Sequence, residues 1–187
     1  ERTSKADLPA FFGAVGEDEE ADRLKAVLQE ASIPFEGFVS AGTTILKTRI
    51  MARQQQLCRL DREGAPRAYA VKTEDIVAAL RKHLGEIDLI LLSDYGKGVL
   101  EDPLLQAVAE LAKEAGRPLL LDPKPRRPRN WPKVDLMTPN RSEALELAGI
   151  VWDEHEPYPL EAVSAAIWER YKPRHLVITL GAAGMAY

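Results

Sequence analysis

The sequence lacks several features that would assign it to common protein classes. It contains a single cysteine, Cys58, in 187 residues, so neither an intrachain disulfide framework nor a cysteine-rich metal site can form. No stretch resembles a signal peptide or a membrane-spanning helix. The formal net charge of -4 gives no basic surplus of the kind that general nucleic-acid-binding proteins carry, although a local basic patch is compatible with it. We expect a cytoplasmic protein without nucleic-acid or membrane partners.

Most of the chain alternates between short apolar runs and helical patterns. Hydrophobic residues make up 45% of the sequence, enough to bury the core of one good-sized domain. The expected strands cover 11–15, 87–92, 118–121, 134–137 and 176–180, and the expected helices cover 21–31, 102–116, 140–149 and 162–171. Within the second helix, Asp102 is the expected N-cap and Pro103 the first helical residue. This alternation predicts an α/β fold with a parallel sheet covered on both faces.

Residues 35–63 depart from this pattern because they lack a helical period and alternate instead. The charged or polar residues of one parity are Lys47, Arg49, Arg53, Gln55, Arg59 and Asp61. Their neighbours of the other parity include Leu46, Ile50, Cys58 and Leu60. We expect one or two strands with a charged face, set apart from the main sheet, and a hairpin if the chain turns near Gln54. The predicted division is a small piece at 35–63 and a body at 1–34 and 64–187.

Four expected strands end in polar, charged or glycine-bearing turns. Their sequences are SDYGKG at 93–98, DPK at 122–124, TPNRSE at 138–143 and TLGAAG at 179–184. In an open parallel sheet, ligands bind at the carboxyl ends of the strands. Glycine lets backbone N–H groups approach a phosphate, a helix N-terminus adds positive partial charge, and a lysine supplies a full charge. These turns therefore predict a site for a phosphorylated ligand, with Glu143 holding Mg²⁺ through water.

Each turn also has a purely structural interpretation. Asn140 and Glu143 have the spacing of a helix capping box, and Gly96 and Gly98 fit a tight turn. Lys124 and the basic string after it, Arg126, Arg127 and Arg129, are typical of a solvated loop. The chain has neither a Walker A sequence nor a GxGxxG motif, which disfavours the P-loop and dinucleotide-binding classes and favours a kinase of another architecture.

The order of these motifs resembles the ribokinase-like (PfkB) carbohydrate kinases, and among them the D-glycero-β-D-manno-heptose-7-phosphate kinases, the kinase modules of ADP-heptose synthases in lipopolysaccharide core biosynthesis. The resembling stretches are KTRIMARQQQLCRLDRE (47–63), LILLSDYGKGVL (89–100), LLLDPK (119–124), LMTPNRSEALE (136–146) and LVITLGAAGM (176–185). The TPNxxE and glycine turns mark the broad family. The RxQQLxRLD, SDYxKG and DPK patterns point to the heptose kinases.

The resemblance implies a ribokinase-like three-layer sandwich with a mostly parallel sheet, a β lid at 35–63 and homodimerisation through the lid. It also implies Mg²⁺-dependent transfer of phosphate from ATP to the anomeric hydroxyl of heptose 7-phosphate, giving the 1,7-bisphosphate. The residues implied for ATP and phosphate binding are Lys124, Asn140, Glu143, Thr179, Gly181 and Gly184. The residues implied for the sugar phosphate are Arg53, Gln55, Asp94 and Lys97.

Two family motifs are missing from the sequence. The family's glycine- and asparagine-bearing sugar motif should precede residue 11, where the chain reads ERTSKADLPA, and its GAGD turn should follow Tyr187. Because the aspartate of that turn is the family's catalytic base, we assign the role to no residue and expect a chain that is incomplete at both ends. A kinase of another sugar or nucleoside and a non-catalytic ligand-binding protein of the same fold stay open as alternatives.

Overall fold

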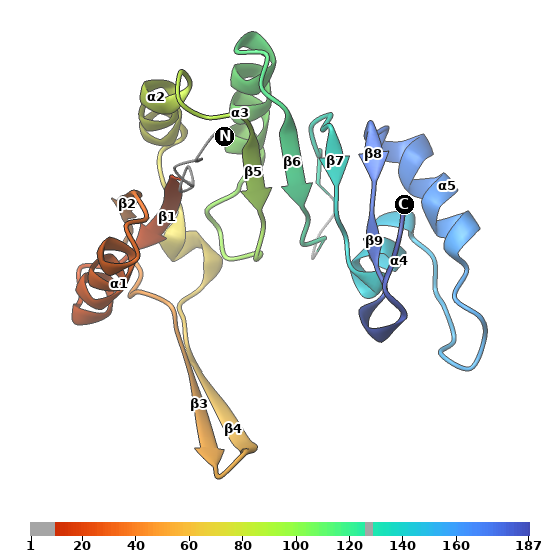
Figure 1. Ribbon diagram of the computed structural model, residues 1–187, viewed down its shortest axis with the longest axis horizontal. Helices are drawn as coiled ribbons and strands as arrows, with labels where there is room; N and C mark the ends of the chain where they lie inside the picture. Colours follow the sequence, from red (N-terminus) through yellow and green to blue (C-terminus); the bar gives the residue numbers. More distant parts are fainter. Residues whose placement is uncertain (1–9, 126–128) are drawn as a thin grey trace, which may run out of the picture. The chain divides into compact units, whose positions relative to one another are not determined.

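The computed structural model describes residues 10–125 and 129–187 (Figure 1). They form two compact units, the first running to Leu80 and including Lys97–Val99, and the second comprising Arg81–Gly96 and Leu100–Tyr187. Within the described ranges, no helix is long and apolar enough to cross a membrane.

The first unit begins with a parallel strand pair connected by a helix. Its elements are β1 (Phe11–Val15), α1 (Glu19–Glu30), β2 (Phe35–Val39), β3 (Leu46–Ala52), β4 (Gln55–Arg62), a 3-10 helix (Pro66–Tyr69) and α2 (Thr73–His83), of which the last turn passes into the second unit. β1 and β2 pair in parallel. Asp18 caps α1, because its carboxylate accepts the N–H of Ala21 at 3.0 Å and that of Thr44 at 2.7 Å. These two bonds fix the start of the helix against the segment that leads into β3.

β3 and β4 form a separate antiparallel hairpin with its turn at Arg53 and Gln54. Lys47 pairs with Asp61 and Arg49 with Arg59, so these four side chains share one face, as their parity predicts. Ile50 pairs with Cys58 on the other face. The parity rule is wrong at the tip: Arg53 lies in the turn, and Gln55 pairs with Ala52 on the face of Ile50, because the register shifts beside Met51.

The segment 35–63 does not form one structural piece. Its first part, Phe35–Val39, is β2 and pairs with β1, whereas the hairpin belongs to a different sheet. The rings of Phe11 and Phe35 stack at 5.8 Å between centroids, which ties the two parallel strands together at their first residues. This pairing is nonlocal, so the alternating pattern of 35–39 could not distinguish it from a hairpin strand.

The second unit is built on four parallel strands in the order β5-β6-β7-β8. Its elements are β5 (Ile90–Ser93), α3 (Asp102–Glu114), β6 (Leu119–Asp122), β7 (Leu136–Met137), α4 (Arg141–Ala148), α5 (Leu160–Tyr171), β8 (His175–Leu176), β9 (Ile178–Thr179), a 3-10 helix (Gly181–Ala183) and β10 (Met185–Ala186). The carboxyl ends of the four parallel strands point the same way (Figure 1). Leu121 and Met137, on the two central strands, are completely buried. The predicted parallel sheet is confirmed, and its strand ends set the geometry of the candidate site.

Two helices differ from the sequence prediction. α2 was not expected, although Glu74 and Asp75 in its first turn and three basic residues in its last turn suit a helix. The N-cap of α3 is Glu101 and not Asp102. The carboxylate of Asp102 instead accepts a hydrogen bond from Arg129 at 3.1 Å, so it does not cap the backbone.

Candidate functional site

The four strand ends of the second unit surround one pocket, which we call the strand-end pocket. It has a volume of about 480 Å³, and its lining residues are Leu91, Ser93, Asp122, Thr138, Asn140, Glu143 and Thr179. They come from the ends of β5 and β6, the turn after β7, the first turn of α4 and the end of β9. The predicted meeting of the strand-end turns is therefore observed within this unit, and the pocket is of a size that suits a small molecule.

Asn140 and Glu143 line this pocket and form one connected group with Lys124 beside it. Asn140 caps α4 by accepting the N–H groups of Ser142 and Glu143 at 3.1 and 3.0 Å, and Glu143 accepts the N–H of Asn140 at 2.9 Å. The second oxygen of Glu143 accepts a hydrogen bond from the Lys124 ammonium at 2.7 Å. The capping interpretation is therefore correct, but it uses only one carboxylate oxygen. The other oxygen forms an ion pair with Lys124 beside the pocket. A phosphate could replace Glu143 as the partner of Lys124, and a cation could replace Lys124 as the partner of Glu143.

Asp122 is a pocket residue that the sequence interpretation did not select. It is the last residue of β6, and its register partner on β5 is Ser93, whose hydroxyl hydrogen-bonds to it. Burial raises the pKa of the Asp122 carboxyl, the nearby Glu143 carboxylate raises it further, and the Ser93 hydrogen bond lowers it. Two carboxylates therefore repel each other across the pocket, and a bound cation would relieve that repulsion. The position of Asp122 at a strand end was the available signal.

The raised pKa of Asp122 predicts a pH-dependent gain in stability for Asp122→Asn. Since the folded state favours the protonated carboxyl, ionisation of Asp122 destabilises the fold as the pH rises above the ordinary carboxyl value. The neutral asparagine should therefore raise the melting temperature of the intact protein at pH 7, and the gain should vanish at a pH below that ordinary value. Thermal unfolding at several pH values tests this, with the exposed Asp88→Asn as control. A gain that is the same at all pH values would contradict the electrostatic cause.

The last candidate residues of this unit are Thr179, Gly181 and Gly184, at the end of β9 and in the turn after it. Thr179 lines the pocket and forms an isolated bridge with Asn140. Gly181 and Gly184 have φ values of 64° and 88° and form the turn between β9 and β10. A side chain at either glycine would meet no atom within 4 Å, so the backbone conformation and not crowding within the chain explains the choice of glycine. The turn leaves its backbone open toward a ligand.

A buried ionic group, which we call the Arg129 cluster, lies behind the first strand end. The side chains of Arg129 and Asp94 are only 4% and 3% exposed, and they meet at 2.6 Å. Arg129 also donates to Asp102 and to the carbonyl of Leu100, and its guanidinium lies over the ring of Trp131. The solvated-loop interpretation is wrong for Arg129, because two acidic partners distant in sequence draw it inward; Arg126 and Arg127 lie outside the described residues.

Both carboxylate oxygens of Asp94 accept hydrogen bonds from within the protein. One oxygen accepts from Arg129, and the other accepts the N–H of Gly96 at 2.7 Å. Gly96 has a φ of 64°, so the bond closes a turn that glycine favours. In this arrangement Asp94 shapes the SDYGKG turn.

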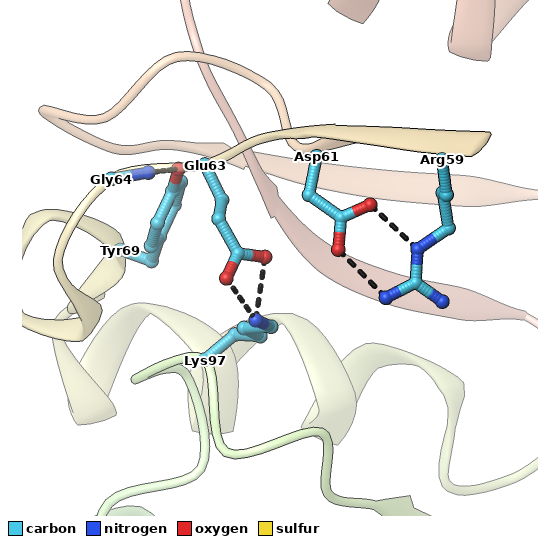
Figure 2. Close-up of polar contacts among 6 residues, drawn as sticks. All are labelled: Arg59, Asp61, Glu63, Gly64, Tyr69 and Lys97. Atoms are coloured by element: carbon cyan, nitrogen blue, oxygen red, sulfur yellow. Dashed lines mark hydrogen bonds and ion pairs between the residues drawn. The ribbon is translucent and has the colours of Figure 1, made fainter. Parts of the chain in front are cut away.

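The other sugar-side candidates lie in the first unit, at opposite ends of the hairpin. At its base, Lys97 pairs with both carboxylate oxygens of Glu63 at 2.5 and 2.6 Å, and this bond holds the pKa of Glu63 below its usual value (Figure 2). Arg53 and Gln55 lie at the tip, where Arg53 has no polar partner among the described residues. The nine residues from Gln55 to Glu63 span about 25 Å as a strand. The structure therefore does not bring Arg53 and Gln55 together with Lys97 in one chain.

The base of the hairpin is fixed by Tyr69. This side chain is 1% exposed, and its hydroxyl accepts the N–H of Gly64 at 2.6 Å (Figure 2). Along the strand above it, Arg59 and Asp61 form a two-bond ion pair at 2.7 and 2.9 Å. Gly98 must remain glycine here, because a side chain on it would lie 1.9 Å from the carbonyl oxygen of Pro66. The Lys97 turn and the foot of the hairpin are therefore held together.

Among the described residues, no group of three or more histidine, cysteine or acidic side chains could hold a metal ion. The strand-end pocket supplies two carboxylates, from Asp122 and Glu143. This donor set suits Mg²⁺, which keeps several waters and takes one or two carboxylates together with phosphate oxygens. It does not suit a fully protein-bound metal.

Comparison with known proteins gives the fold and then the family. The structure is similar to a ribokinase from Giardia lamblia, with a TM-score of 0.67, 21% identity and coverage of 94% of this chain and 57% of that one. It is also similar to an Anopheles gambiae adenosine kinase, with a TM-score of 0.65, 21% identity and coverage of 92% and 55%. These likenesses define a ribokinase-like α/β fold.

The family is shown by the sequence. Residues 8–187 match the family described as pfkB family carbohydrate kinase. The chain is 33% identical over 174 residues to the bifunctional protein HldE of Citrifermentans bemidjiense, covering 92% of this chain and 35% of that protein. It is 35% identical over 177 residues to the protein of the same name in Caulobacter sp. strain K31, covering 94% and 36%. The chain belongs to the pfkB family of carbohydrate kinases, and it spans about a third of the length of these relatives.

Proposed function

We propose that this chain is the kinase part of an enzyme that transfers phosphate from ATP to the anomeric hydroxyl of D-glycero-β-D-manno-heptose 7-phosphate, in the cytoplasm and for ADP-heptose synthesis. The observation that carries a phosphotransfer role is the joined group of Lys124, Asn140 and Glu143 at the strand-end pocket. The choice of heptose is supported by the identity with HldE proteins over most of this chain.

The strand-end pocket would hold the phosphates of ATP. Lys124 supplies a cation, and the Gly181–Gly184 turn supplies backbone N–H groups beside Thr179. Glu143, with Asp122, would hold Mg²⁺ through its waters, and the metal would neutralise charge on the transferred phosphate. When ATP binds, Lys124 can release Glu143 and turn to the phosphate, which frees a carboxylate oxygen for the hydrated metal. We propose no residue as the catalytic base.

The sugar phosphate would be held by Arg53, Gln55, Asp94 and Lys97. Asp94 would act by shaping the turn before Lys97, since its own oxygens are occupied. The separation between the hairpin tip and Lys97 means that both contribute to one sugar site only if two protomers supply them. A homodimer through the hairpin allows this arrangement.

The exposed apolar face of the hairpin supports such a dimer. Ile50 and Leu60 are 41% and 59% exposed and share a face with Cys58. A two-stranded hairpin with an uncovered apolar face is only marginally stable alone, and a second hairpin would cover it. Size-exclusion chromatography with light scattering on the intact protein and on Leu60→Lys tests this proposal. A monomeric wild-type protein would overturn it.

Arg53→Ala should weaken binding of the sugar phosphate and leave nucleotide binding unchanged. A hydrogen bond between the charged Arg53 guanidinium and a phosphate oxygen would contribute about 1.5–3 kcal/mol. Calorimetric titration of the intact protein with heptose 7-phosphate and, separately, with an ATP analogue measures both affinities. Arg23→Ala, at an exposed position on α1, is the matched control. Equal losses for both ligands would mean that the hairpin had been disrupted, and no loss for either would remove Arg53 from the site.

The activity itself is tested by ATP consumption. The intact protein should consume ATP with heptose 7-phosphate in preference to fructose phosphates or ribose. Preference for another sugar would retain the kinase and overturn the heptose assignment. No consumption with any sugar would favour a non-catalytic ligand-binding protein of the same fold.

A further inference from the structure

A second cavity, which we call the basic cavity, opens at the amino ends of the strands in the second unit. It has a volume of about 670 Å³ and is lined by the last turns of α3, by the segments 116–119 and 132–135 that lead into β6 and β7, and by Lys172 and Arg174 before β8. The strand-end pocket lies at the carboxyl ends of the same strands. The two hollows therefore lie at opposite ends of the strands of the sheet.

The charge of the basic cavity is opposite to that of the whole chain. Its cationic side chains are Lys113, Arg117, Lys133, Lys172 and Arg174, and its acidic side chains are Glu110 and Asp135. An excess of three positive charges in one hollow contrasts with a formal net charge of -4 for the chain. A concave surface lined by charges of one sign concentrates ions of the other sign. Average composition does not explain this segregation.

The acidic side chains neutralise little of this charge. One oxygen of Asp135 accepts the N–H of Leu119 at 2.9 Å, and the other lies 3.8 Å from Arg174, whose side chain is 75% exposed. Among the described residues, Lys133 and Lys172 have no side-chain ion pair. Such an exposed and distant pair contributes little. Most of the cationic groups are therefore available to a ligand.

Arg117 has donor capacity that the protein does not use. One terminal nitrogen donates to the carbonyl of Leu84 at 3.1 Å. Its Nε is buried and has no hydrogen-bond partner among residues 10–125 and 129–187. Buried donors are nearly always paired, so the hydrogen-bonding capacity of Arg117 is not fully used within the described part of the chain.

Helix ends explain only part of the arrangement. Lys113 and Lys172 lie at the carboxyl ends of α3 and α5, where cations are favoured by the helix dipole. However, Lys172 adopts a φ of 50°, a conformation that favours glycine at this cap. Arg117 lies two residues beyond the cap of α3, whereas Lys133 lies in the segment before β7, where no helix ends. Their approach to the same hollow calls for another cause.

We propose that the basic cavity binds a small molecule that carries two or more phosphate groups. Its volume lies within the range of roughly 300–1,000 Å³ that is usual for small-molecule sites. Lysine and arginine side chains from three segments can contact separate phosphates, as multivalent anions require. This inference does not depend on the heptose assignment, because it concerns the other edge of the sheet.

Calorimetric titration of the intact protein with inorganic triphosphate tests the proposal. Wild-type protein should bind two triphosphate ions, one at each hollow. Lys133→Glu/Lys172→Glu should lose one of them, with affinity reduced roughly tenfold or more. Lys25→Glu/Lys82→Glu makes the same change in net charge outside the cavity and should retain both. Lys124→Met, which removes the cation paired with Glu143 of the strand-end pocket, should retain the ion at the basic cavity.

Two further measurements keep the result unambiguous. If the glutamate variant does not fold, Lys133→Gln/Lys172→Gln replaces it, and a circular dichroism spectrum confirms the fold. Repeating the titration with ADP and with fructose 1,6-bisphosphate distinguishes a nucleotide from a sugar bisphosphate as the preferred ligand. Undiminished triphosphate binding by the cavity variant would overturn the proposal. Kinase activity without added triphosphate should be the same in this variant, so failure of the heptose assignment would be seen separately.

Discussion

Arg129→Met is expected to lower the free energy of unfolding by about 3–5 kcal/mol, which is the cost of removing one partner of a buried ion pair. The Asp94 carboxylate would stay 3% exposed and lose its 2.6 Å contact with the guanidinium. Methionine would fill much of the same volume beside Trp131, so the loss would come mainly from the missing guanidinium contacts. Urea unfolding of the intact protein, followed by tryptophan fluorescence, measures the change; all three tryptophans of the chain lie in the second unit.

Two variants separate the buried charge from other causes. Arg81→Met removes an exposed ion pair with Glu114, 3.7 Å long, and should cost about 0–1 kcal/mol. Arg129→Met combined with Asp94→Asn removes the charge of both partners of the buried pair and should recover part of the loss. Equal losses for Arg129→Met and Arg81→Met would show that burial of the pair has no energetic effect.

Glu143→Gln is expected to reduce Mg²⁺-dependent kinase activity by about 10–100-fold, as is typical when a group that orients a metal is altered. Glutamine is as acceptable as glutamate at the third position of a capping box, so the bond to the N–H of Asn140 can persist. The negative charge facing Lys124 and the hydrated metal is lost. Steady-state kinetics at several Mg²⁺ concentrations on the intact protein measures the effect.

Glu161→Gln provides the matched control, because Glu161 lies in the first turn of α5 and outside the strand-end pocket. It should retain full activity. If Glu143→Gln instead lowered the melting temperature strongly while the folded fraction kept normal activity, Glu143 would be a capping residue only.

Local sequence patterns predicted the parts of the site that depend on short-range spacing. Asn140 and Glu143 are three residues apart, so a single helix turn brings them together, and the sequence contains that spacing. The hairpin was predicted for the same reason, since its alternation depends on neighbouring residues. α2 is the exception, because it lies outside the sequence prediction although its acidic first turn and basic last turn are local signals.

The remaining features depend on contacts between distant residues. Asp122 meets Ser93 only because β5 and β6 pair in one register, and its raised pKa also needs Glu143 from the next turn. Arg129 belongs to a basic string that favours solvent, and its burial follows from Asp94 and Asp102, both more than twenty residues away. Neither the Asp122–Ser93 contact nor the burial of Arg129 is encoded in a short stretch of sequence. The sequence therefore indicated where strands end, but it did not indicate which residues meet there.

The β3–β4 hairpin has a fixed base and exposed strands, and this contrast affects its local stability. Tyr69 and the Lys97–Glu63 pair fix its base, whereas every residue of β4 is exposed. Backbone bonds without buried side chains open at low free energy. We therefore expect the hairpin to unfold locally, as a unit of its own, and its amide protons to exchange with solvent by that route. The amide protons of the buried strands β6 and β7 should exchange only through much larger unfolding events.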